Sequence, residues 1–376
     1  MPDAVATTLY SEIIKKCETK PNFPVVTFEN GEGYADEVVT YEGLVSGACK
    51  IARALREAGI GKGDRFSVVM RNHPEFLYAM IAASMTGAVM VPIDPRSKGS
   101  KLSYQIGDSG SKGIIFTAEF ASEVKESLAE LKDVKVIGVS YKEGFDTEIL
   151  KEYPSLNEIL AGPEAAVPDN ANIEPNAPLE VIYTSGTTGD PKGVVIKANR
   201  FPMFTMLAQF VWQYTEQDRL YTGLSLTHGN AQAVTLVPSL ALSIPSVISR
   251  RFTKSRLWDI CRKHGCTTFS LLGGMMMAIY SEPPRPDDAD NPVRVVLSAG
   301  TPRSIWEDFE RRFNVKIHEW YGAVEGGFAH NPPGVGPVGS FGKPIEGIME
   351  MKVVREDDTE CAPGEIGELI VVPKQG

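Results

Sequence analysis

The sequence predicts an α/β protein with two helix-covered, mainly parallel sheets packed together and a small C-terminal β-barrel subdomain. Through most of the chain, short apolar runs alternate with segments of helical periodicity. From Asn331 on the pattern changes to glycine-rich turns and short strands, which fits a small β-barrel or an antiparallel sheet. Such alternation is typical of parallel strands joined by helices, because those strands are buried on both faces. The 376 residues suffice for roughly two or three core-forming units.

The elements of the first half follow this alternation in order. Helices show apolar residues at helical spacing, and strands are short runs rich in Val, Ile and Phe. The expected order is helix 41–60, strand 63–70, helix 76–86, strand 87–94, helix 101–110, strand 112–116 and strand 134–139.

Residues 76–93 approach the length of a membrane span. Asn72 and Pro74 indicate a helix start just before this stretch, and Gly87 indicates a helix stop within it. A helix followed by a buried strand explains the same apolar residues without lipid, so we predict no membrane span.

The second half begins after a connector rich in Pro, Ala and Asn at 164–178. Its predicted elements are strand 179–185, a long apolar segment 201–249, strands 266–272 and 293–300 around a surface loop, and short strands within 334–372. We therefore predict three parts: a first α/β subdomain over 1–170, a second over 171–330, and the β-barrel subdomain over 331–376.

Charge and cysteine content limit the classes of function. A formal net charge of −10 argues against nucleic acid or an anionic membrane surface as the main partner. The five cysteines are scattered, which fits a reducing compartment, and Cys261, His264 and Cys266 lack the second ligand pair of a zinc site. The first residues show no secretory signal, so we expect a cytoplasmic protein, with a homodimer as one oligomeric state to consider.

The segment "YTSGTTGDPKG" at 183–193 has the character of a phosphate-binding loop. It follows a buried strand, and its glycines let successive backbone N–H groups point at an anion. Hydroxyls of Ser185, Thr187 and Thr188 add donors, and Lys192 adds a positive charge. Pro191 stands where the P-loop of nucleotide triphosphatases requires glycine, so this is a phosphate loop of another kind.

This segment resembles the signature of adenylate-forming enzymes, which include acyl-CoA synthetases, firefly-type luciferases and the adenylation domains of peptide synthetases. Further segments resemble that family in their order along the chain and in their separation. Within the family, the resemblance is greatest to the carboxylate–CoA ligases. They are "THGNAQ" at 227–232, "LSAGTP" at 297–302, "EWYGAVEGG" at 319–327, "GSFGKP" at 339–344 and "GEIGELIVV" at 364–372.

The resemblance implies roles for individual residues. Catalytic roles fall to Thr184, Lys192, His228 and Glu325, and Glu325 would also hold the metal. The implied nucleotide-binding residues are Thr184, Ser185, Gly186, Thr187, Thr188, Gly189, Lys192, Gly300, Thr301, Pro302, Glu319, Trp320, Tyr321, Gly322, Ala323 and Val324. The implied residues of the acyl pocket are Trp212, His228, Gly273, Gly274, Met275 and Gly322.

The implied reaction joins a small-molecule carboxylic acid to ATP with Mg²⁺, releases pyrophosphate, and passes the acyl group to coenzyme A. The alternatives are an adenylating enzyme that loads a carrier protein, and a non-catalytic nucleotide- or acyl-binding domain. Two residues depart from the family pattern: Val324 stands where a Thr is usual, and Thr227 where an aromatic often precedes the motif His. The family's small mobile domain would follow Gly376, and the sequence does not contain it.

Overall fold

The computed structural model describes residues 8–142, 144–168, 174–184 and 189–373, and the chain divides into two compact units. Unit 1 is Met1–Phe252 and unit 2 is Thr253–Gly376. The three-part division predicted from the sequence, with limits at 170 and 330, stays a prediction.

Unit 1 contains two sheets and most of the helices. Its helices are α1 (Leu9–Thr19), α2 (Tyr41–Glu57), α3 (Pro74–Thr86), α4 (Gly99–Asp108), α5 (Ala121–Glu130), α6 (Leu156–Ala161), α7 (Arg200–Phe210), the π-helix η3 (Ala231–Leu236) and α8 (Val237–Leu242), with short 3₁₀ turns at Ala118–Phe120 and Glu148–Lys151. Its strands are β1 (Pro24–Glu29), β2 (Glu37–Thr40), β3 (Arg65–Val69), β4 (Val89–Ile93), β5 (Ser111–Thr117), β6 (Lys135–Ser140), β7 (Pro178–Thr184), β8 (Lys192–Lys197), β9 (Leu220–Thr222) and β10 (Ser246–Ser249).

The larger sheet of unit 1 has six strands in the order β6-β5-β3-β4-β7-β8. All neighbours run parallel except β7 and β8, which form an antiparallel pair with β8 at the edge. The other strands of the unit follow the order β9-β10-β1-β2, parallel apart from β1 with β2. The prediction of mainly parallel, helix-covered sheets is confirmed, and the seven elements predicted in the first half end within three residues of the observed ones.

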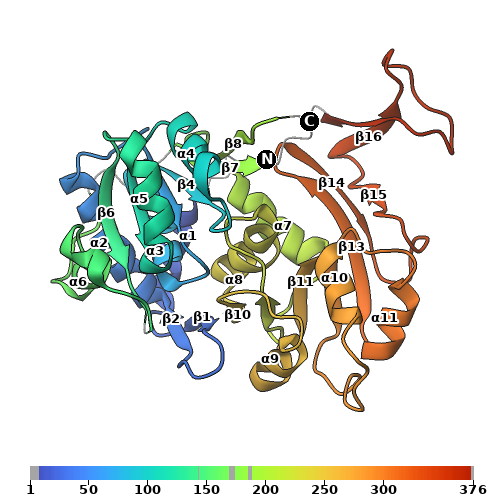
Figure 1. Cartoon of the computed structure of the whole chain (residues 1–376). Helices are drawn as coiled ribbons and strands as arrows, with labels where there is room; N and C mark the ends of the chain where they lie inside the picture. Colours follow the sequence, from blue (N-terminus) through green and yellow to red (C-terminus); the bar gives the residue numbers. More distant parts are fainter. Residues whose placement is uncertain (1–7, 143, 169–173, 185–188, 374–376) are drawn as a thin grey trace. The chain divides into compact units, whose positions relative to one another are not determined.

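A continuous apolar core joins the six-stranded sheet to α4 and α5 (Figure 1). It contains Leu102 from α4, Val124 from α5, Val91 and Phe116 from β4 and β5, and Val181 from β7. Because β7 contributes to the same core as the parallel strands, the strand itself is anchored to the body of the unit.

Helix α3 begins at Pro74, one of the two residues that indicated a helix start, and two residues before the predicted bound at 76. Pro74 is the first helical residue and His73 is the N-cap, but the His73 side chain makes no capping hydrogen bond. The Asn72 amide instead donates to the carbonyls of Leu224 and Ser249, both at 2.8 Å, and accepts from the amide of Leu226. Gly87 ends the helix in the left-handed conformation, φ 74°, as predicted.

Unit 2 is built around five strands in the order β15-β14-β13-β12-β11. Strands β11 (Thr268–Leu272), β12 (Val295–Ala299) and β13 (Lys316–Ala323) are parallel, whereas β14 (Gly326–Asn331) and β15 (Lys343–Pro344) are antiparallel. Its helices are α9 (Leu257–His264), α10 (Gly273–Tyr280) and α11 (Trp306–Phe313). An aromatic core of Trp258, Phe269, Phe309 and Phe313 joins α9 and α11 to β11.

The last strands, β16 (Met349–Val354) and β17 (Glu368–Pro373), form a two-stranded antiparallel sheet. The antiparallel strands predicted here are present, but the predicted β-barrel must be corrected, because the part of the chain with described positions contains no closed barrel in this region. Closure needs enough tilted strands to return to the first one, and two strands cannot do so. The small sheet contacts β14: a Cβ on Gly327 would lie 2.7 Å from Val371.

Across 8–142, 144–168, 174–184 and 189–373, none of the helices combines the length and the apolar character that crossing a bilayer requires.

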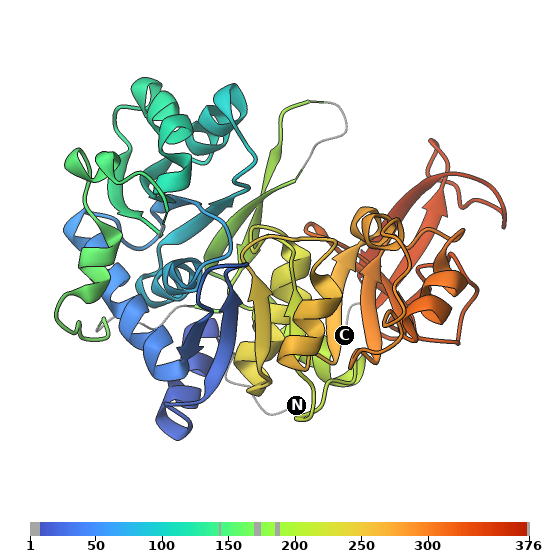
Figure 2. The ribbon, with the colours of Figure 1, turned by 60° about the horizontal axis from the view of Figure 1, so that its bottom comes forward.

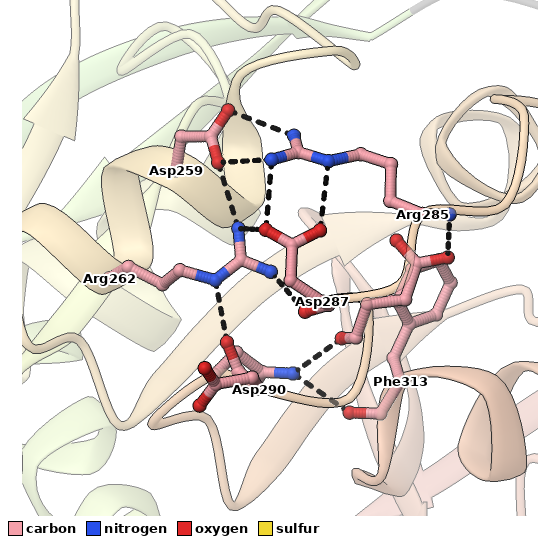
Figure 3. Close-up of polar contacts among 8 residues, drawn as sticks. Asp259, Arg262, Arg285, Asp287, Asp290 and Phe313 are labelled. Atoms are coloured by element: carbon pink, nitrogen blue, oxygen red, sulfur yellow. Dashed lines mark hydrogen bonds and ion pairs between the residues drawn. The ribbon is translucent and has the colours of Figure 1, made fainter.

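Ion pairs fasten the loop after α10 to α9 (Figure 3). Asp259 accepts from Arg262 at 2.8 Å and from Arg285 at 3.0 Å, and Arg285 also pairs with Asp287. These side chains are close to half exposed, apart from Arg262. A second pair in the same region is buried: Arg312 binds Asp288 at 2.7 Å, with side-chain exposures of 15% and 8%.

The two arginines should therefore differ in their effect on stability. Arg312→Met leaves Asp288 buried without its cation and should lower the free energy of unfolding by about 3–5 kcal/mol. Arg285→Met removes two half-exposed pairs, with Asp259 and Asp287, and should cost about 1 kcal/mol or less. Urea denaturation of both variants measures the difference, and equal losses would show that burial does not set the strength of these pairs.

Candidate functional site

In unit 1, the candidate phosphate loop is the connection of a β-hairpin. Strands β7 and β8 pair from Pro178–Lys197 to Thr184–Lys192, so Lys192 lies directly across the ladder from Thr184 (Figure 2, yellow-green strands). Lys192 and Gly189 are exposed. Ser185, Gly186, Thr187 and Thr188 lie outside the described residues. The hairpin thus places the cation of Lys192 beside the carboxyl end of β7.

Close packing and one hydrogen bond fix the hairpin below this pair. Gly193 lies opposite Tyr183, and a Cβ at Gly193 would come within 2.9 Å of the Val181 side chain. The Tyr183 hydroxyl donates to Asp108 on α4 at 2.6 Å, and burial raises the pKa of Tyr183. A glycine after Lys192 is therefore needed for the strands to approach, whatever its role in the loop.

Glu180 is a buried carboxyl on β7 that the sequence reasoning missed. Its side chain is fully buried, and neither of its oxygens has a hydrogen-bond partner among the described residues. Its neighbours across the sheet are Met90 and Ile196, and burial raises the pKa of Glu180 to about 8, with Gln232 as the facing polar group. The sequence signal was an acid within the apolar strand "PLEVIYT".

His228 follows β9 in a loop that buried amide side chains hold. The backbone N–H of Asn230 donates to Nδ1 of His228 at 3.2 Å, so Nδ1 is the acceptor and the neutral ring carries its proton on Nε2. His228 is exposed to solvent, and the surrounding chain partly desolvates its ring. This desolvation lowers the pKa of His228, which is therefore neutral near pH 7.

The π-helix η3 also holds the loop that carries His228. Gln232 donates to the carbonyl of Leu226 at 2.9 Å, next to the amide that Asn72 binds. Trp212, predicted for the acyl pocket, is 3% exposed and lies beside Tyr214, whose hydroxyl donates to Val234 of η3. Trp212 thus packs on Tyr214, which is hydrogen-bonded to η3. Contact of Trp212 with an acyl group stays a prediction.

In unit 2, the candidate adenine loop is held by Glu319 of β13. Its carboxylate accepts the backbone N–H groups of Gly300 and Thr301, the latter at 3.1 Å and 3.2 Å. Glu319 is 3% exposed and its pKa is raised by burial. The structure therefore places this predicted nucleotide residue as a positioning group for the loop at the end of β12.

The loop at the end of β12 also contacts the first residue of α10, and this contact is between backbone atoms. A Cβ at Gly273 would lie 1.8 Å from the carbonyl oxygen of Gly300, so only glycine allows this approach. Gly274 is exposed and Met275 half-buried, whereas Met276 is a core residue, and their place in an acyl pocket stays a prediction. Unit 2 thus brings together Gly273, Gly300 and Thr301, and Pro302 continues the loop half-buried.

Alternate residues of β13 face opposite sides. Trp320 is buried and stacks on Phe328, with ring centroids 6.0 Å apart, so its indole does not face the side of Tyr321. A Cβ at Gly322 would lie 2.7 Å from the Trp320 ring. Tyr321 is half-buried on the opposite face and lies 5.1 Å from the ring of Phe341.

Val324 and Glu325 form the turn between β13 and β14, flanked by the pair Ala323–Gly326. Gly326 has φ 142°, which an L residue rarely adopts, so this glycine makes the tight turn possible. The turn leaves the Glu325 carboxylate exposed. No cluster of three or more His, Cys, Asp or Glu side chains that could hold a metal occurs within the ranges that the structure describes. A Mg²⁺ ion at Glu325 would thus use one carboxylate together with phosphate oxygens, a combination that it favours.

The fold is one seen in solved acyl-CoA ligases. A benzoate CoA ligase from Burkholderia xenovorans LB400 aligns with a TM-score of 0.84 at 20% identity, covering 97% of this chain and 71% of that one. A family model described as "AMP-binding enzyme" matches residues 14–374. The chain belongs to this AMP-binding enzyme family.

Curated relatives carry fatty-acid names. The long-chain fatty acid transport protein 2 of Rattus norvegicus is 27% identical over 361 residues, which are 93% of this chain and 55% of the relative. The medium/long-chain-fatty-acid–CoA ligase FadD6 of Mycobacterium tuberculosis is 27% identical over 79% of this chain and 48% of its own length. The chain thus spans about half the length of these relatives.

Lys192 should contribute strongly to nucleotide affinity, because a charge-assisted bond to phosphate is worth about 1.5–3 kcal/mol. Lys192→Ala should weaken ATP binding by about tenfold to a hundredfold in calorimetric titration. Lys197→Ala, an exposed lysine on the same strand, is the matched control and should bind like the parent. Equal ATP affinities for the parent and Lys192→Ala would contradict the phosphate role.

Glu180 should make stability fall as pH rises. The folded protein keeps a proton on Glu180 up to about pH 8, whereas the unfolded chain releases it near pH 4.3. Between these values the unfolded state binds fewer protons, so the free energy of unfolding declines by about 1.4 kcal/mol per pH unit. Denaturation of Glu180→Gln should show this slope reduced, whereas the exposed control Glu130→Gln should keep it.

Proposed function

We propose that this protein activates a carboxylic acid with ATP to an acyl-adenylate and then forms the thioester with coenzyme A. The observation that carries the proposal is the pairing of Thr184 with Lys192 at the mouth of the β7–β8 hairpin. That register sets a hydroxyl and a cation beside each other at the end of a buried strand, a combination suited to polyphosphate.

The first step needs orientation and charge neutralisation more than proton transfer. A carboxylate is already ionised near pH 7, so no general base is required when its oxygen attacks the α-phosphorus of ATP and pyrophosphate leaves. The ammonium of Lys192 would stabilise negative charge on the departing phosphates. The Nε2–H of neutral His228 would donate to a carboxylate oxygen and orient the acid without repelling it by a like charge or protonating it.

Residues of unit 2 would hold the nucleoside. The exposed face of Tyr321 is suited to stacking on adenine, and the loop of Gly300, Thr301 and Pro302, fixed by Glu319, would line the base. Glu325 would hold Mg²⁺, which when bound neutralises phosphate charge. Val324 offers no hydroxyl to the α-phosphate where the usual Thr would.

The acid is proposed to be apolar. Gly274 and Met275 of α10 would offer an unhindered, adaptable wall, and relatives bear long-chain and medium/long-chain fatty-acid names. We therefore place medium- to long-chain acids first and compact aryl or alicyclic acids second. Loading of a carrier protein in place of coenzyme A, and binding of nucleotide or acyl group without turnover, are the alternatives.

Pyrophosphate exchange into ATP tests the first step across a panel of fatty and aryl acids. Exchange that depends on both Mg²⁺ and an acid, and that falls by about tenfold or more in Lys192→Ala but not in Lys197→Ala, is the expected result. Binding of ATP with no exchange for any acid would favour the non-catalytic alternative. Adding coenzyme A or a phosphopantetheinylated carrier protein then identifies the acceptor through the thioester formed.

A further inference from the structure

Phe341 lies within the segment at 339–344 that resembles adenylate-forming enzymes, but it is not among the residues to which that resemblance assigns a role. We propose that it is a positioning residue for the nucleotide, packing on one face of Tyr321 so that the other face is presented to the base. This inference rests on the proposed function, because it assumes that Tyr321 stacks on adenine.

The two rings are in direct contact. Their centroids lie 5.1 Å apart with an interplanar angle of 35°, within the range of a packed aromatic pair. No base fits between rings at that spacing, so a stacked purine could meet Tyr321 only on the face turned away from Phe341. Phe341 is nevertheless 40% exposed, which is unusual for a large apolar ring whose role is only to fill a core.

The loop that carries Phe341 is held by a buried amide. Asn331, 3% exposed at the end of β14, donates to the carbonyls of Pro337 at 3.1 Å and Ser340 at 3.0 Å, and accepts from the amide of Gly336 at 2.9 Å. All hydrogen bonds of this side chain thus go to one short loop. The residue before Phe341 is fixed by the same contacts.

Backbone packing fixes the other end of the loop. Gly342 has φ 86°, and a Cβ there would lie 1.8 Å from the carbonyl oxygen of His330. The main chain on both sides of Phe341 is therefore fixed against β14, which leaves its ring a narrow range of directions. An exposed aromatic on a rigid loop loses little conformational entropy when it supports a ligand-binding ring.

The same loop also reaches the candidate adenine loop. Gly339, φ 87°, lies against the side chain of Arg303, whose Cβ would be 2.9 Å from a Cβ on the glycine. Arg303 directly follows Pro302. Residues 336–342 therefore contact both proposed adenine-binding elements of unit 2: the loop after β12 through Arg303, and β13 through Tyr321.

The test measures AMP affinity by calorimetry in a double-mutant cycle of Phe341→Ala and Tyr321→Leu. Tyr321→Leu should weaken AMP binding by about fivefold to a hundredfold, as loss of a stacking partner does. Phe341→Ala should weaken it by about threefold to tenfold in the parent and have no effect in Tyr321→Leu, since it acts through that ring. Phe341→Tyr keeps an aromatic ring and should restore parental affinity.

Controls separate positioning from general damage. Val335→Ala, 75% exposed on the preceding turn, should bind AMP like the parent, and inorganic pyrophosphate should bind all variants equally. If Phe341→Ala does not fold, as judged by its thermal transition, Phe341→Leu takes its place.

The outcomes also distinguish this inference from the proposed function. Parental AMP affinity in Tyr321→Leu would overturn the adenine-stacking role, and this inference with it. Weakened binding in Tyr321→Leu together with parental binding in Phe341→Ala would overturn the positioning role alone. Equal losses for Phe341→Ala in the parent and in Tyr321→Leu would also overturn it, because the effect would then not pass through Tyr321.

Discussion

The candidate nucleotide elements of unit 2 depend on one buried carboxylate, that of Glu319. By accepting the amides of Gly300 and Thr301, it holds the end of β12 in a sharp left-handed bend at Gly300, φ 86°. A buried carboxylate is costly unless its oxygens are bonded, and buried amides are costly unless they find an acceptor, so each group satisfies the other. The bend brings the backbone of Gly300 against Gly273, and β13 then carries Tyr321 two residues beyond Glu319. The loop after β12, the start of α10 and the Tyr321 ring thus all depend on the position of Glu319.

Periodicity and turn chemistry predicted seven strands and helices between residues 41 and 140, but not α5 in the same stretch, nor α1, β1 and β2 before it. Residues 41–140 alternate clearly because each strand is buried on both faces, and Gly87 marks a helix end by its conformational freedom. The predicted barrel failed for a different reason. Residues 349–373 carry the alternation of antiparallel strands, but alternation does not determine how many strands pair or whether the sheet closes.

The sequence indicated which residue types form the candidate site, but it did not indicate most of the contacts that these residues make. The run of glycines and hydroxyls before Lys192 indicates phosphate chemistry, yet only strand register shows that Lys192 faces Thr184. Glu319 was predicted among the nucleotide-binding residues; in the structure it binds the loop amides, because a carboxylate in a buried strand finds the nearest donors. The roles of Glu180, Asn331 and Phe341 depend on tertiary neighbours distant in sequence. The sequence signal for Glu180 was an acid alone in an apolar strand, and the signal for Phe341 was an aromatic in a glycine-rich segment. Neither pattern reveals a role without the tertiary contacts.

The position of β8 at the edge of the six-stranded sheet also bears on how the protein behaves in concentrated solution. An edge strand presents backbone donors and acceptors that can pair with another chain, and Val195 adds an apolar side chain that is 51% exposed there. Lysines stand at both ends of this strand, at 192 and 197, and their charges oppose the approach of a second edge. Lys192, which we propose binds phosphate, therefore also disfavours edge-to-edge aggregation. Under the proposed phosphate role, one ammonium group would serve both nucleotide binding and solubility, and bound nucleotide would neutralise part of its charge while itself covering the end of the strand.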